Sequence, residues 1–107
     1  STQVMRRLLP ILDDLELAFE RVPATPGEDQ AGWVDGFRQI QRKILGLLVE
    51  DGVKPIASDG EFDPTLHEAV TSEPGGDVPS GHIIATLRTG YEQHGHVLRP
   101  ALVRVAA

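Results

Sequence analysis

Large apolar residues in the first half of the chain recur at alternating intervals of three and four residues. This spacing places them on one face of an α-helix. The pattern occurs twice, on either side of a loop at residues 23–29. The first stripe is Met5, Leu8, Leu12, Leu15, Phe19 and Val22, and the second is Trp33, Phe37, Ile40, Ile44 and Leu47. The first half of the chain therefore predicts two amphipathic helices.

The apolar faces of these two helices are too wide for the helices to cover each other completely. A flanking stripe lies beside the second one, formed by Val34, Gln41, Leu45 and Leu48. A second copy of the chain would cover the remaining surface and give a four-helix bundle built from two chains. The alternative cover is the second half of the same chain. We expect the homodimer, with an interface formed by Leu8, Leu12, Leu15, Phe19, Trp33, Phe37, Ile40, Ile44 and Leu47.

Local signals suggest where the helices begin and end. Pro10 should kink or break the first helix, because its ring clashes with the carbonyl of Arg6 and it has no N–H to donate there. Residues 4–9 would then be the tail of an earlier helix. Residues 25–28 have the form of a capping box, with Asp29 as an alternative N-cap for the second helix. Gly52 should end that helix.

The chain changes character after Gly52, where prolines, histidines and β-branched residues become frequent. We therefore divide it into a helical segment, residues 1–52, and a small all-β domain, residues 53–107. Together they predict an α+β fold. The domain should contain five or six short strands, drawn from residues 53–56, 68–71, 82–87 and 96–105, with a single helical turn at residues 64–68.

Two turns shape the end of this predicted domain. His94 and Gly95 mark a hairpin turn, since glycine adopts positive φ easily. Pro100 falls inside the return strand, where it removes a donor, so it should lie at a bulge or an unpaired edge. Val97, Ala101, Val103 and Val105 should share one face of that strand.

Composition excludes several classes of function. The net charge of -6 argues against a nucleic-acid binder and against a protein that binds anionic membranes. There is no cysteine, which excludes disulfides, thiolate catalysis and Cys-ligated zinc. No apolar run approaches the roughly 20 residues of a membrane-spanning helix. A reducing, cytoplasmic setting fits this composition.

Histidines offer the one candidate for catalysis. His94 and His96 would lie on one face of a strand, and His67, His82 or a carboxylate could supply a third metal ligand. A small metal-dependent enzyme is therefore one hypothesis. A polar hairpin tip is the alternative, and we favour it because no other catalytic constellation is present. We expect an interaction protein that is not an enzyme, with no metal and no cofactor.

Four motifs resemble segments of the GrpE family, in order and over essentially the whole chain. Residues 62–70, Phe-Asp-Pro-Thr-Leu-His-Glu-Ala-Val, resemble its FDPxxHEAV signature. Gly90-Tyr91 and residues 95–101 resemble its GY…GRVLRPAxVxV ending. Residues 8–15 are similar to its LLPVLDxL segment, and residues 34–37 resemble the opening of its bundle helix.

The resemblance implies a nucleotide exchange factor for a DnaK-type heat-shock chaperone. Family members are homodimers in which a long paired helix enters a four-helix bundle and a β-domain, or wing, projects from each chain. One wing docks on the chaperone's ATPase domain and opens its cleft, so that ADP leaves and ATP enters. This sequence begins just before Pro10 and would lack most of the long N-terminal helix.

The resemblance also implies which residues of the wing meet the chaperone. Phe62 and Pro64 lie in the signature, and Leu87 lies in the strand before Gly90. His96 stands where the family usually has arginine, so Arg99 or Arg88 would supply the charge, although Arg99 could equally be structural. Gly90, Tyr91 and Pro100 should shape the fold. A dimeric scaffold without exchange activity is an alternative, as is the metal-dependent enzyme that uses His94 and His96.

Overall fold

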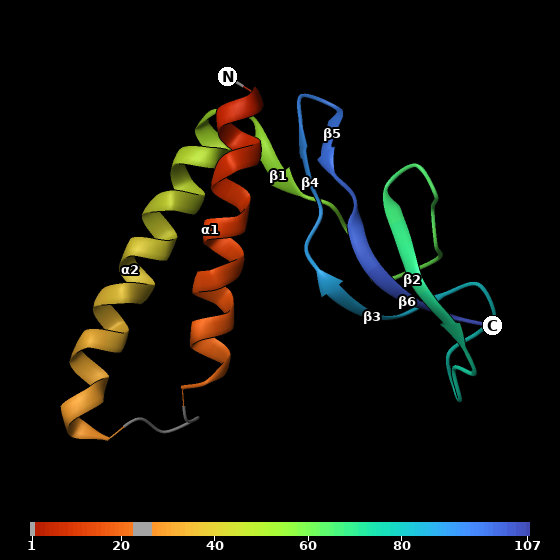
Figure 1. Ribbon diagram of the computed structural model, residues 1–107, viewed down its shortest axis with the longest axis horizontal. Helices are drawn as coiled ribbons and strands as arrows, with labels where there is room; N and C mark the ends of the chain where they lie inside the picture. Colours follow the sequence, from red (N-terminus) through yellow and green to blue (C-terminus); the bar gives the residue numbers. More distant parts are fainter. Residues whose placement is uncertain (1, 23–26) are drawn as a thin grey trace. The chain divides into compact units, whose positions relative to one another are not determined.

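The computed structural model describes residues 2–22 and 27–107, in two compact units (Figure 1). The helical unit is Ser1–Asp51 and the β unit is Gly52–Ala107. The predicted α+β fold is confirmed: two helices are followed by six short strands. None of the helices in the described ranges is both long and apolar enough to cross a membrane.

The helical unit contains α1, Thr2–Glu20, and α2, Glu28–Glu50. The break expected at Pro10 is wrong, because α1 continues through this residue as one helix. Residues 4–9 are therefore not the tail of a separate helix. Proline removes a single hydrogen bond from the helix. Leu9 and Leu12, which lie on either side of it, are both buried and stabilise the helix on both sides.

The ends of α2 agree only in part with the sequence signals. The predicted capping box lies partly outside the described residues. Asp29 as N-cap is wrong, because α2 already begins at Glu28, after an extended Gly27 with φ −62° and ψ 162°. The other end is confirmed: Asp51 is the C-cap, and Gly52 follows it with φ +80°. The left-handed backbone at Gly52 ends the helix as C′ glycines do.

The two apolar stripes of α2 differ in exposure. Val34 and Leu48 of the flanking stripe are buried, as are Met5, Leu9 and Leu12 of α1. The other stripe, which we call the main stripe, consists of Trp33, Phe37, Ile40, Ile44 and Leu47. All of these except Ile44 face outward, with 46–62% of each residue exposed. A single chain therefore uses the flanking stripe for its own packing and leaves the main stripe open.

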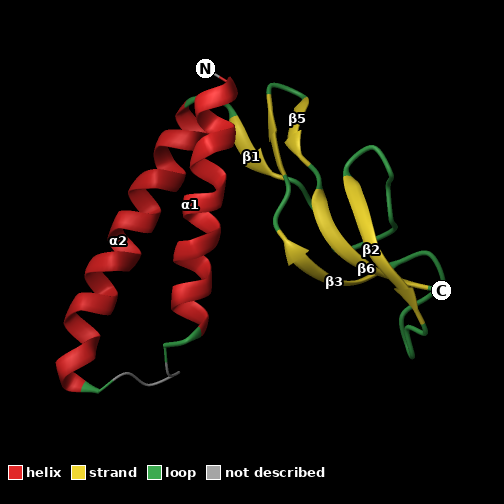
Figure 2. Cartoon of the chain, in the orientation of Figure 1, coloured by secondary structure: helices red, strands yellow, loops and turns green. Residues whose placement is uncertain are grey.

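The β unit consists of two three-stranded sheets (Figure 2). Strands β1 (Val53–Pro55), β4 (Tyr91–Gln93) and β5 (His96–Arg99) form one sheet in the order β1-β4-β5, with antiparallel neighbours. Strands β2 (His67–Glu73), β3 (Ile83–Arg88) and β6 (Ala101–Ala106) form the other in the order β2-β6-β3. In this second sheet, β6 is parallel to β2 and antiparallel to β3.

Pro100 separates the two sheets. It lies between β5 and β6 and belongs to neither, which confirms that this position is unpaired. The chain leaves one sheet and enters the other here, so the predicted single return strand is divided. Ala101, Val103 and Val105 are buried as expected, but before the proline Leu98 is buried and Val97 is only half-buried. The predicted common face is therefore wrong at Val97.

The core of the second sheet lies on one face of β6. Ala101, Val103 and Val105 form its buried cluster, and Phe62 and Ile83 pack against them. The turn before β2 is shorter than predicted, because it covers residues 64–66 and His67 already belongs to the strand.

Candidate functional site

The signature segment folds as a capped turn that leads into β2. The Asp63 carboxylate accepts hydrogen bonds from the Thr65 amide at 2.8 Å and from the Thr65 hydroxyl at 2.6 Å. These bonds to Thr65, the hydroxyl first, lower the pKa of Asp63 below its usual 3.8. The Asp63 carbonyl accepts from the amides of Leu66 and His67 at 3.0 and 2.8 Å. The side chain and the main-chain carbonyl of Asp63 therefore both hold the turn in place.

His67 is a structural residue and has no free nitrogen for a metal. It is 6% exposed. Its Nδ1 accepts from the Asp63 amide at 3.0 Å, so the ring proton lies on Nε2, which donates to the Ala57 carbonyl at 2.7 Å. The Phe62 ring lies against it, with 6.0 Å between centroids. The imidazole thus ties the segment before the turn to the start of β2.

The expected chaperone-binding residues fall into two groups. Pro64, Leu87 and His96 are exposed. Leu87 is 54% exposed and lies at a register shift of β3, between Thr86 and Arg88. Phe62 is instead half-buried against the core. The side chains most accessible to a partner are therefore those of the first group.

Arg99 contacts the segment around Gly90 within the β unit. Its Nε donates to the Thr89 carbonyl at 2.9 Å, and its guanidinium carbon lies 5.4 Å from the centroid of the buried Tyr91 ring. Gly90, between these two partners, approaches β6 so closely that a Cβ would lie 2.3 Å from the Ala101 nitrogen. These contacts favour the structural interpretation of Arg99, and they give Gly90 and Tyr91 the fold-shaping role expected of them.

The alternative charge, on Arg88, is also partly withdrawn from the surface. Arg88 is half-buried at the end of β3. Its Nε is buried and, within residues 2–22 and 27–107, has no hydrogen-bond partner. Neither arginine therefore presents its whole guanidinium group to a partner.

The two neighbouring histidines do not form the expected pair. His94 lies in the turn between β4 and β5 with φ +51°, and Gly95 follows with φ +81°. His96 is the first residue of β5 and pairs with Gln93. The prediction that both imidazoles share one strand face is wrong, because His94 is not on a strand. Among the described residues, no group of three or more His, Asp or Glu side chains could hold a metal ion.

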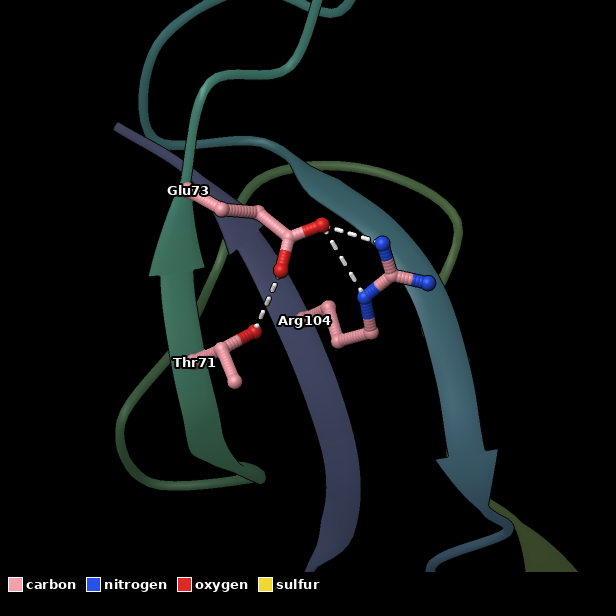
Figure 3. A network of polar contacts seen from close by, with 3 residues as sticks. All are labelled: Thr71, Glu73 and Arg104. Carbon is pink, nitrogen blue, oxygen red and sulfur yellow. Dashed lines mark hydrogen bonds and ion pairs between the residues drawn. The ribbon is translucent and has the colours of Figure 1, made fainter.

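A polar network that the sequence analysis missed joins the parallel strands β2 and β6 (Figure 3). Glu73 accepts from Nε of Arg104 at 3.1 Å and also from its Nη2, and from the Thr71 hydroxyl at 3.0 Å. Arg104, and then Thr71, lower the pKa of Glu73, and Glu73 raises the pKa of Arg104. The two charges lie 31 residues apart, so no local pattern could have revealed the pair.

The helical unit carries an apolar hollow of about 210 Å³ between its two helices, lined by Leu15, Ala18, Phe19, Val22, Trp33 and Phe37. Trp33 and Phe37 meet edge to face at 5.8 Å, and the Arg38 guanidinium lies 4.5 Å from the Phe19 centroid. Several expected interface residues thus line an open surface. Leu12 is 1% exposed in the single chain and has no comparable surface to offer a partner.

The chain is similar to known proteins over its whole length. The family model described as GrpE matches residues 1–107. "Protein GrpE" of Helicobacter hepaticus is 39% identical over 104 residues, which cover 96% of this chain and 55% of that protein. The Exiguobacterium sibiricum protein of the same name is 35% identical over 99% of this chain and 56% of its own length. The Thermotoga maritima protein is 36% identical over 96% and 57%. The chain spans about half the length of these curated relatives. On the match over its whole length, the chain belongs to the GrpE family.

Proposed function

We propose that this chain acts as a nucleotide exchange factor: its β unit binds the ATPase domain of a DnaK-type chaperone and favours release of ADP. The observation that carries the proposal is the fold of the family signature. It forms a tightly bonded turn, while Pro64, Leu87 and His96 remain exposed for a partner. The buried His67 and the bonded Asp63 serve the fold, so these signature residues have structural roles.

Such a protein needs no covalent chemistry. It binds the open, nucleotide-free form of the chaperone more tightly than the closed form. The shift in the chaperone's equilibrium equals the difference between these two affinities and cannot exceed it. A β unit held rigidly by its own hydrogen bonds serves this purpose, because less conformational freedom is lost when it docks.

We also propose that the protein is a homodimer that works in the cytoplasm. The main stripe of α2 supports the dimer, since its large apolar residues are about half exposed in the single chain. The adjoining hollow at Phe19 and Trp33 offers a place for apolar side chains of a second copy. The net charge of -6 supports a protein partner over nucleic acid or an anionic membrane.

The test is the rate at which a fluorescent ADP analogue leaves the cognate DnaK-type chaperone. We expect the wild-type chain to accelerate release many-fold. In Leu87→Asp this acceleration should be about tenfold smaller, since a position buried in the interface would then hold a charge. Val70→Asp is the matched control, because Val70 is 53% exposed on the opposite edge strand β2, against 54% for Leu87. A wild-type chain that leaves the release rate unchanged would refute exchange activity.

A further inference from the structure

The imidazole of His94 lies directly on the backbone of Gly52. A Cβ built on Gly52 would lie 2.3 Å from Cε1, 2.7 Å from Nδ1 and 2.8 Å from Nε2 of that ring. The His94 amide also points to the Gly52 carbonyl, at 3.4 Å. The ring therefore occupies the space that any side chain at position 52 would need. Only glycine at position 52 permits this contact.

The backbone of His94 has an uncommon conformation. Within residues 2–22 and 27–107, His94 is the one non-glycine residue with positive φ. This left-handed conformation is uncommon for residues other than glycine, and asparagine, aspartate or glycine is the usual choice in such a hairpin turn. A strained residue persists where its surroundings support it, and such residues cluster at functional sites.

The supported turn carries an expected docking residue. Gln93 pairs with Val53 in β1 and with His96 in β5, so it connects the first strand of the β unit with the β4–β5 hairpin. Val53 and Gln93 are both buried, whereas His96 is exposed. The orientation of His96 thus depends on how firmly the turn between Gln93 and His96 is held.

We propose that His94 is a positioning residue for chaperone docking: its imidazole, seated on Gly52, holds the β4–β5 hairpin so that His96 is presented in one orientation. The inference rests on the proposed function and adds to it a residue that does not itself touch the chaperone. A hairpin that is fixed before binding has less freedom to lose on docking, and this raises affinity.

Three substitutions separate the ring contact from the turn. His94→Asn keeps a residue suited to left-handed backbone but removes the ring. His94→Ala removes both advantages. Gly52→Ala places a Cβ against the ring. Gly81→Ala is the matched control. Gly81 has φ +82° against +80° at Gly52, yet a Cβ built there would have no described atom within 4 Å apart from those of its chain neighbours.

The first measurement is the affinity for the chaperone. We expect His94→Asn, His94→Ala and Gly52→Ala each to weaken binding by about three- to tenfold. Gly81→Ala should bind as the wild type does. The Gly52→Ala/His94→Ala double variant should be little weaker than either single variant, because the two residues act through one contact. Wild-type affinity in His94→Asn would overturn the proposal, and so would effects of the single variants that simply add.

The second measurement is amide hydrogen exchange at residues 93–96 in the free chain. Exchange there should accelerate about tenfold in His94→Asn and Gly52→Ala but not in Gly81→Ala. Unchanged exchange overturns the inference even where the wild type binds the chaperone. A wild type that binds no chaperone overturns the proposed function and the docking role together. Accelerated exchange in that case still identifies the contact as the support of the hairpin.

Discussion

Replacement of His67 should destabilise the β unit more than replacement of any other histidine. In the wild type, Nδ1 and Nε2 of His67 lie 3.0 Å from the Asp63 amide and 2.7 Å from the Ala57 carbonyl. His67→Ala removes both nitrogens and leaves both backbone groups without these partners. Each hydrogen bond contributes about 1 kcal/mol net, and a polar group left unsatisfied costs about 1–3 kcal/mol. The ring also packs on Phe62. We expect a total loss of about 3 kcal/mol in the free energy of unfolding.

A graded series tests this reasoning. His67→Asn offers an amide oxygen near the position of Nδ1, so it should keep the bond from the Asp63 amide and lose about half as much stability as His67→Ala. His82→Ala is the control: its Nδ1 lies 3.4 Å from the exposed Ser80 carbonyl, and the change should stay within about 0.5 kcal/mol.

Hydrogen exchange of the β2 and β6 amides, followed against denaturant concentration, measures the free energy of unfolding of this sheet. A loss below about 0.5 kcal/mol in His67→Ala is the size of an ordinary surface substitution. That result would refute the claim that this buried imidazole holds the signature turn.

Three further predictions concern charge and assembly. The pKa of Glu73 lies below its usual 4.5, so its stabilising contribution is present above that pH and is lost as the pH falls through the lowered value. Glu73→Gln should therefore flatten the loss of stability in acid titrations followed by circular dichroism; an acid titration curve that matches the wild type would contradict this. His96→Arg should raise chaperone affinity at low salt and much less at high salt, because the guanidinium is longer and carries a permanent charge that salt screens; unchanged low-salt affinity would contradict this. Ile40→Glu should shift the chain from dimer to monomer in sedimentation experiments, whereas Arg42→Glu, at an exposed position, should not. If the Ile40→Glu variant remains a dimer, the interface lies elsewhere.

The helices and most of the strands follow from local patterns. The three-and-four spacing of apolar residues identified both α1 and α2, because a helix face repeats with that period. The same spacing could not show which stripe of α2 the chain keeps for itself. Val34 and Leu48 are buried while Trp33 and Leu47 are exposed, and this choice depends on how the two helices pack.

The details that the sequence left open depend on distant contacts. The parallel pairing of β2 with β6 and the bond between Glu73 and Arg104 join segments far apart in the chain. The continuity of α1 through Pro10 shows packing overriding a local signal. The metal hypothesis is wrong for a local reason instead: the spacing of His94 from His96 suits a strand, but His94 lies in the hairpin turn that Gly95 favours.

The place of β6 at the centre of its sheet has a consequence for the order of folding. Both β2 and β3 pair with β6, although β6 follows them in sequence. A ribosome therefore synthesises two edges before the strand that joins them. The helices need only nearby residues and can form early, whereas this sheet waits until residue 106 has emerged. A chain interrupted before Ala101 would leave the N–H and C=O groups of β2 and β3 without their partner strand. Unpaired strand edges of this kind promote aggregation.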